Sequence, residues 1–220
     1  MDKELLNKQA QHWEKTFSKK SEMFGVSPSV AATKARDIFK KKGYTKILEI
    51  GAGQGRDTFF FAENGFNVHA LDYSQAGINN ITQNAKKLGL SNLITATHHD
   101  IRKSLPYKNT TFDACFSHML YCMALTKKDL KYLSGELYKV LKTGGINIYT
   151  ARNTQDGDYK NGFHVGENLY ENDGFIVHFF SHQTIKEISD GFKIINIEKF
   201  EEGKFPRKLF IVTLKKVLVK

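Results

Sequence analysis

The stretch 47-ILEIGAGQGRDT-58 places a short apolar run and an acid before three glycines at alternating positions. The apolar run is typical of a buried strand, and the residues from Arg56 onward are typical of a helix. Glycines between a strand and a helix let the backbone approach a ligand, and the helix start offers it free N–H groups. The loop by itself fits a nicotinamide dinucleotide, a phosphate, another nucleoside-bearing cofactor or a tight turn.

Strand-like and helix-like segments alternate around this loop. The apolar runs predict strands at 46–51, 67–74, 94–100, 112–119 and 146–153. Helical spacing between them predicts helices at 56–65, 75–89 and 126–145. Strands that alternate with helices of this length predict a doubly wound, mostly parallel α/β sheet.

The two ends of the chain follow other patterns. A predicted helix at 181–191 precedes two strands within 192–216 that a polar turn joins, which favours antiparallel pairing. Residues 154–180 are rich in Gly, Asn, Asp and aromatic residues and are predicted to form a long functional loop. Residues 1–40 are predicted to form two helical pieces separated at Pro28, which together form a cap.

The composition is that of a globular protein with a basic balance. Lys and Arg total 33 against 23 Asp and Glu, a formal net charge of +10, but the lysine pairs are scattered along the chain. Scattered lysines indicate a solvated surface more than a nucleic-acid stripe. The two cysteines form no disulfide framework and no zinc-binding CxxC pair, so no metal is expected. Without a signal-peptide core or a membrane-length apolar stretch, we expect a cytoplasmic setting and no membrane partner.

Acidic residues end the two strands that follow the loop. Asp72 ends the strand at 67–74, where an acid can accept hydrogen bonds from both hydroxyls of a ribose. Asp100 ends the strand at 94–100, where it can meet the amine or the ring edge of an adenine. The third glycine comes one residue earlier than in the dinucleotide pattern GxGxxG, which argues against a nicotinamide cofactor.

These motifs, in this order, resemble those of the class I S-adenosylmethionine-dependent methyltransferases. The segments that carry the resemblance are LEIGAGQG (48–55), ALDYS (70–74), HHDI (98–101), LPYKNTTFDACFSHM (105–119) and LYKVLKTGGINIY (137–149). Thr143 stands where proline is common in that family. The resemblance covers roughly residues 40–152 and implies a seven-stranded, mostly parallel sheet with an antiparallel C-terminal strand. It also implies one domain over 1–220: a cap at 1–40, a cofactor-binding core at 41–153, and an acceptor-side loop with antiparallel edge strands at 154–220.

The resemblance assigns S-adenosylmethionine as the cofactor and S-adenosylhomocysteine as the product. In this assignment Glu49 suits the methionine ammonium, and Arg56 suits the methionine carboxylate. The cofactor-binding residues are then predicted to be Glu49, Gly51, Ala52, Gly53, Gly55, Arg56, Asp72, Tyr73, Ser74, Asp100, Ile101, Ser117 and His118. Side chains after the fourth and fifth strands lie where the acceptor binds, so His118, Tyr121 and Arg152 are the predicted catalytic residues.

The sequence does not decide which class of molecule accepts the methyl group. The sequence GQGR in the loop also resembles the tellurite-resistance-like methyltransferases, which favours a small-molecule acceptor. We expect a monomer or homodimer. The net charge of +10 keeps an RNA or protein acceptor as the alternative. Two readings from other classes are an NAD-dependent oxidoreductase and a cofactor-binding module without catalysis.

Overall fold

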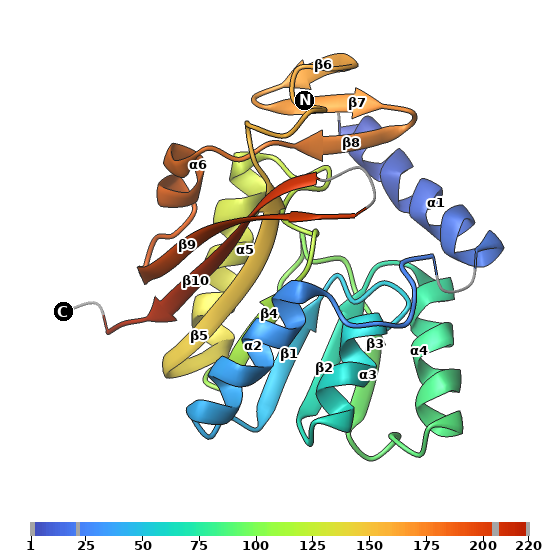
Figure 1. Ribbon diagram of the computed structural model, residues 1–220, viewed down its shortest axis with the longest axis vertical. Coiled ribbons are helices and arrows are strands. Elements are labelled where there is room, and N and C mark those ends of the chain that lie inside the picture. Colours follow the sequence, from blue (N-terminus) through green and yellow to red (C-terminus); the bar gives the residue numbers. More distant parts are fainter. Residues whose placement is uncertain (1–2, 21–22, 204–206, 219–220) are drawn as a thin grey trace.

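A large sheet of seven strands forms the centre of the computed structural model, which describes residues 3–20, 23–203 and 207–218 (Figure 1). Across the sheet the strands lie in the order β3-β2-β1-β4-β5-β10-β9. Their bounds are β1 Lys46–Ile50, β2 Asn67–Asp72, β3 Ile94–His98, β4 Phe112–Ser117, β5 Leu141–Arg152, β9 Phe192–Glu202 and β10 Arg207–Lys216. The strands β1 to β5 pair in parallel, and β10 pairs antiparallel with both β5 and β9. The predicted sheet with one antiparallel C-terminal strand is confirmed.

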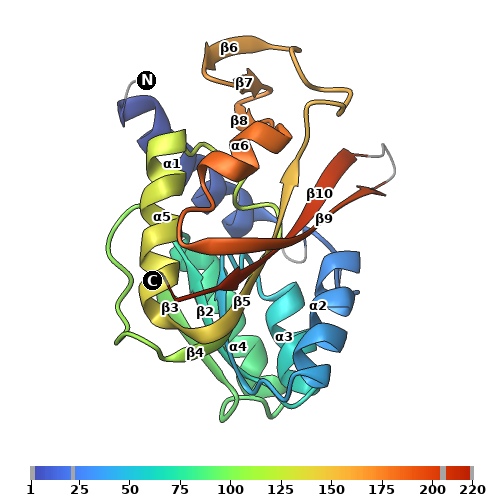
Figure 2. The ribbon, with the colours of Figure 1, turned by 90° about the vertical axis from the view of Figure 1, so that its left-hand side faces the viewer.

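Helices cover both faces of this sheet (Figure 2). Their bounds are α1 Lys3–Lys19, α2 Val30–Lys41, α3 Arg56–Glu63, α4 Gln75–Lys87, α5 Lys127–Val140 and α6 His182–Glu187. Successive side chains of β1 point to opposite faces of the sheet, as in any strand. Ile47 packs in a core cluster with α2 and α3, whereas Leu48 and Ile50 pack in the cluster that contains α5 and α6. Of the helices in the described part of the chain, none has the length and apolar character needed to cross a bilayer.

A second, smaller sheet corrects the prediction for residues 154–180. This segment contains three antiparallel strands, β6 Phe163–Gly166, β7 Leu169–Asn172 and β8 Phe175–His178, instead of a long loop. Asp173 and Gly174 join β7 to β8 with φ angles of 50° and 83°. Two positive φ angles in a two-residue turn match the twist of a hairpin, and Asp-Gly is a favoured pair there. In Figure 1 this sheet lies above the carboxyl edge of the large sheet, beside α1.

The glycine pair Gly144 and Gly145 falls within a strand, although the helix predicted at 126–145 included it. The helix α5 ends at Val140, and Gly144 and Gly145 lie inside β5 instead of ending a helix. The pairing of β4 with β5 shifts its register between Phe112 and Ala114, next to this pair. A Cβ on Gly145 would lie 2.9 Å from the carbonyl oxygen of Asp113, so the irregular pairing depends on glycine.

Candidate active site

The glycine loop connects the end of β1 to the start of α3. Gly51 and Gly55 have φ angles of 72° and 91°, a conformation that glycine adopts at little cost. The N–H groups of Gly51 and Ala52 both donate to the carbonyl of Leu71, at 2.8 and 3.1 Å, which fixes the loop against β2. A Cβ on Gly51 would lie 2.8 Å from the Cβ of Leu120. The loop is therefore a close-fitting backbone surface that larger residues would block.

Asp72 lies at the end of β2 and is only 5% exposed. Its two carboxylate oxygens accept hydrogen bonds of 2.8 Å from the N–H groups of Gly53 and Ser74. Burial raises the pKa of Asp72 to about 6, although these N–H groups favour the charged form. A carboxylate can accept about four hydrogen bonds, so this one retains acceptor sites for the hydroxyls of a ribose.

Glu49 is buried at the other side of the loop. Its carboxylate accepts a hydrogen bond of 2.6 Å from the Thr58 hydroxyl. Burial and, after it, the charge of Asp57 raise the pKa of Glu49 to about 8. Because this carboxyl lines the large cavity described below, a cationic group that binds there would favour its ionised form.

Arg56 opens α3 but turns toward the chain itself. Its Nε and Nη2 each lie 3.2 Å from the Asp57 carboxylate, and its Nη1 donates to the carbonyl of Phe24 at 3.3 Å. The same carboxylate accepts hydrogen bonds of 2.8 Å from the N–H and hydroxyl of Ser29, the N-cap of α2. The predicted contact of Arg56 with a cofactor carboxylate stays a prediction, although its side chain lines the large cavity.

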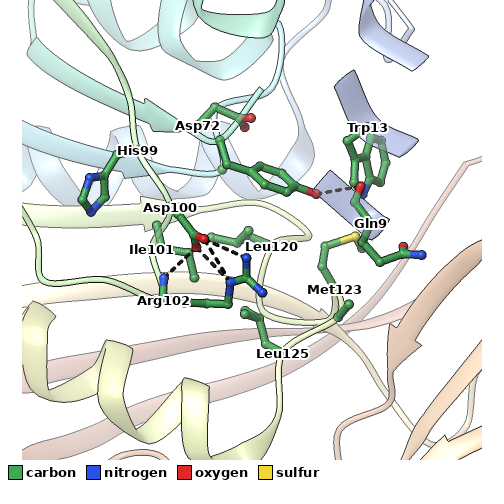
Figure 3. A pocket seen from close by; sticks show the side chains of 13 residues that line it. Gln9, Trp13, Asp72, His99, Asp100, Ile101, Arg102, Leu120, Met123 and Leu125 are labelled. Carbon is green, nitrogen blue, oxygen red and sulfur yellow. Dashed lines mark hydrogen bonds and ion pairs between the residues drawn. The ribbon is translucent and has the colours of Figure 1, made fainter. Parts of the chain in front are cut away.

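A small cavity of about 50 Å³ lies between the ends of β2 and β3 (Figure 3). Tyr73, Asp100 and Ile101, all predicted cofactor-binding residues, line it together with Asp72. Arg102, which was not predicted, holds the Asp100 carboxylate with Nε at 3.0 and 3.1 Å and Nη2 at 2.7 Å. Burial opposes ionisation of Asp100, but this pairing more than offsets it and lowers its pKa. The carboxylate is thereby fixed in the wall of the cavity.

The helix α1 places Gln9 and Trp13 in the wall of the small cavity, and a cap formed by residues 1–40 stays a prediction. Gln9 donates to the carbonyl of Gly174 at 2.9 Å and accepts from the N–H of Ile176 at 3.2 Å, which ties α1 to the small sheet. Glu14 accepts a hydrogen bond of 2.6 Å from Ser74, the N-cap of α4. Ser74 therefore connects α1 to the start of α4, and the Tyr73 hydroxyl donates a hydrogen bond of 3.5 Å to the main-chain carbonyl of Gln9.

A large cavity of about 990 Å³ begins at the glycine loop and Asp72 and extends beneath α1 and the small sheet. Among its lining residues, Glu49, Gly51, Ala52, Gly53, Arg56, Asp72, Tyr73, His118 and Arg152 were predicted from the sequence. Much of the remaining wall is aromatic or apolar, as at Trp13, Phe17, Phe24, Met119, Leu120, Met123, Tyr170, Phe175, Val177, Phe179 and Leu209. Cavities of this size and character are typical of small-molecule sites.

His118 follows β4 and lies in the wall of the large cavity. Its Nδ1 lies 3.1 Å from the hydroxyl of Thr150 on β5, and its Nε2 lies 3.0 Å from the carboxylate of Glu202 on β9. Three strands thus converge on one imidazole at the carboxyl edge of the sheet. Glu202, which was not predicted, lines the same cavity.

Arg152, at the end of β5, is a buried cation in the wall of the same cavity. It forms ion pairs with Asp156 and Asp158, and its guanidinium lies 5.2 Å from the centre of the Phe179 ring. Burial disfavours the charged form, but the two carboxylates more than offset it and raise the pKa of Arg152. Arg152 therefore stabilises the cavity wall as a permanent cation.

Tyr121 is corrected from a catalytic residue to a core residue. It is 2% exposed and lines neither cavity. Its ring stacks on that of Tyr149 with centroids 3.8 Å apart, and its hydroxyl accepts a hydrogen bond of 2.9 Å from Asn147. Burial raises its pKa well above the usual value, so it is no proton acceptor. Ser117, a predicted cofactor residue, is also buried, lines neither cavity and has no hydrogen-bond partner for Oγ among the described residues.

Residues 47–145 match a family model described as a methyltransferase domain. No curated protein matches the chain by sequence. The residues present fit S-adenosylmethionine, because the buried Asp72 carboxylate and the close-fitting glycine loop line the large cavity and also border the small one, where the partly buried Asp100 carboxylate lies. These are the groups that would hold its ribose, its adenine and its methionine part.

Solved structures with the same fold include three methyltransferases. A SAM-dependent methyltransferase of Methanosarcina mazei is 21% identical, over 79% of this chain and 93% of its own, with a TM-score of 0.68. The N-methyltransferase NodS of Bradyrhizobium japonicum, in complex with S-adenosylhomocysteine, is 12% identical, over 94% of this chain and 97% of its own, with a TM-score of 0.69. The 1,6-didemethyltoxoflavin-N1-methyltransferase of Burkholderia thailandensis is 17% identical, over 86% of this chain and 79% of its own, with a TM-score of 0.67. Residues 47–145 therefore form a methyltransferase domain, and the chain as a whole has the fold of the S-adenosylmethionine-dependent methyltransferases.

Proposed function

We propose that this protein transfers the methyl group of S-adenosylmethionine to a small-molecule acceptor by in-line displacement. The observation that carries the proposal is the large cavity of about 990 Å³, which begins at Asp72 and the glycine loop and ends at His118. A donor that occupies the loop end leaves the other end for a second molecule. The Burkholderia neighbour binds 1,6-didemethyltoxoflavin, a small molecule, which supports an acceptor of this kind.

In this proposal the loop end of the cavity binds the donor. Asp72 accepts hydrogen bonds from the ribose hydroxyls, and Asp100, held by Arg102, faces the adenine between Tyr73 and Ile101. Glu49 and the backbone of the glycine loop face the methionine part. When bound, S-adenosylmethionine supplies a methyl group that is already activated on a sulfonium.

The chain then has to align the acceptor and exclude water. Alignment alone supplies several kcal/mol, because it converts a reaction of two molecules into one within a complex. Aromatic side chains such as Trp13, Phe175 and Phe179 exclude water and favour positive charge at their faces. His118 and Arg152 are among the polar groups of this half of the cavity. We also propose that residues 1–220 work as one domain in the cytoplasm, in keeping with the two buried free cysteines.

Methyl-labelled S-adenosylmethionine tests this function. The protein is incubated with the labelled donor and, separately, with a panel of aromatic and heteroaromatic small molecules, with total tRNA and with a protein extract. We expect label in one or more small molecules and none in the macromolecules. Transfer to tRNA or protein alone would overturn the small-molecule assignment.

A further inference from the structure

Glu202 lies on β9, an edge strand of the large sheet, and its side chain lines the acceptor half of the cavity. We use this name for the part of the large cavity that His118 and Arg152 line. Glu202 is the last residue of β9, which runs in the same direction as β4 and β5 because β10 is antiparallel to both β5 and β9. Its carboxyl therefore lies at the same edge as His118. The Glu202 side chain is 26% exposed and the His118 side chain is 12% exposed, so the carboxylate is the more accessible of the two.

The hydrogen bonds around His118 leave no free acceptor on the imidazole. A neutral imidazole has one N–H and one bare nitrogen. Because Nε2 faces the Glu202 carboxylate, it carries the hydrogen, and the bare Nδ1 then accepts from the hydroxyl of Thr150. That hydroxyl oxygen in turn accepts from the N–H of Met119 at 2.8 Å. Both nitrogens are thus occupied by the protein.

Glu202 retains acceptor sites and stays ionised. Burial opposes its ionisation, but the hydrogen bond from His118, the charge of Arg56 and the N–H of Val30 more than offset this and lower its pKa. The two oxygens can accept about four hydrogen bonds, and the His118 and Val30 groups use two of them. Glu202 therefore holds a fixed negative charge that faces the cavity.

We propose that the Glu202 carboxylate, positioned by His118, accepts the hydrogen of the nucleophilic O–H or N–H of an aromatic or otherwise apolar acceptor. This inference rests on the proposed function and names the acceptor class of that site. As the nucleophile attacks, its X–H bond breaks and the proton passes to a Glu202 oxygen. A lone pair of the nucleophilic atom forms the bond to the methyl carbon, the X–H electron pair stays on that atom, and the pair of the broken carbon–sulfur bond stays on sulfur. His118, the residue predicted to be catalytic, is in this account a positioning residue.

Fluorescence of 2-naphthol tests the proposal without knowledge of the natural acceptor. Its excited state is a strong acid, and inside a protein it emits as naphtholate only beside a proton acceptor. The protein saturated with S-adenosylhomocysteine is used in excess over the probe. We expect naphtholate emission from bound 2-naphthol, and binding of 2-methoxynaphthalene, which lacks the donor, at least about tenfold weaker.

Variants locate the proton acceptor. Glu202→Gln should lose the naphtholate emission, whereas His118→Gln, which leaves the carboxylate, should retain a weaker one. Glu201→Gln, on the neighbouring exposed side chain, should behave as the unaltered protein. The affinity for S-adenosylhomocysteine, within about threefold of the unaltered protein, checks that each variant is folded.

Four results would overturn the proposal: no binding of 2-naphthol, equal binding of its methyl ether, naphtholate emission that survives in Glu202→Gln, or emission lost only in His118→Gln. Should Glu202→Gln fail to bind S-adenosylhomocysteine, Glu202→Asp, which keeps a shortened carboxylate, must retain the emission for the proposal to stand. Failure of the proposed function has a separate signature, because the unaltered protein would then transfer no label to small molecules.

Discussion

Binding of S-adenosylhomocysteine should release a proton from Glu49. Burial and the charge of Asp57 raise the pKa of Glu49 to about 8, so at pH 7 about nine in ten molecules carry a proton there. Contact with the ligand ammonium requires the carboxylate, so binding must expel that proton. One pKa unit is about 1.4 kcal/mol, and the observed affinity at pH 7 should therefore be about tenfold weaker than with Glu49 fully ionised.

Calorimetry in two buffers measures this proton directly. Titrations at pH 7 in phosphate and in Tris, whose ionisation enthalpies differ, should give about 0.9 proton released per ligand bound, because that fraction is protonated beforehand. Glu49→Gln should bring the release close to zero. Glu63→Gln, at an exposed position of the same cavity, is the matched control and should leave it unchanged. Equal binding enthalpies in both buffers for the unaltered protein would refute the assignment of Glu49 to the ammonium.

The same pKa predicts how the stability of the ligand-free protein depends on pH. The folded-state pKa of Glu49 is raised from 4.5 to about 8, so the folded state binds more protons than the unfolded state within this window. The free energy of unfolding should therefore fall as pH rises from about 4.5 to 8, by at most about 5 kcal/mol from this group. Urea unfolding between pH 6 and 8 should show the decline, and Glu49→Gln should flatten it. A decline in the free energy of unfolding that is equal in the unaltered protein and in Glu49→Gln would contradict the raised pKa of Glu49.

Three further substitutions have defined outcomes. Asp72→Ala should weaken S-adenosylhomocysteine binding by about 1–3 kcal/mol, since it removes a buried charged acceptor; unchanged calorimetric affinity would remove its ribose role. Gly77→Ala would place a Cβ 2.4 Å from the Gly53 carbonyl oxygen, so we expect a lower melting temperature and weaker binding of S-adenosylhomocysteine. The control is Gly135→Ala, in open space on α5, which should leave the melting temperature unchanged or raise it. Gln9→Ala should leave the fold intact but increase amide hydrogen exchange in α1, and unchanged exchange would show that its two hydrogen bonds do not hold the cap.

The donor half of the site could be predicted from the sequence because its signals are local. Glycines at 51, 53 and 55 directly follow a buried strand, and Asp72 and Asp100 end the next two strands, so parallel pairing alone brings them to one edge. The same reasoning placed His118 in the cavity wall. Each of these positions follows from counting along strands of a known direction.

The acceptor half could not be predicted in the same way. Glu202 meets His118 only because β9 lies at the far side of an antiparallel partner, and no local pattern indicates that contact. Tyr121 was assigned from its distance along the chain from β4, but the turn after the strand directs its ring into the core. For the small sheet a local signal did exist, since Asp173 and Gly174 form a favoured hairpin pair between LYEN (169–172) and FIVH (175–178).

Calorimetric titration with S-adenosylhomocysteine and, in parallel, with NAD tests the central claim most directly. A glycine loop with Asp72 and Asp100 that binds the methyl donor predicts saturable binding of S-adenosylhomocysteine at one site and no heat from NAD beyond dilution. Saturable binding of NAD with no response to S-adenosylhomocysteine would contradict the account.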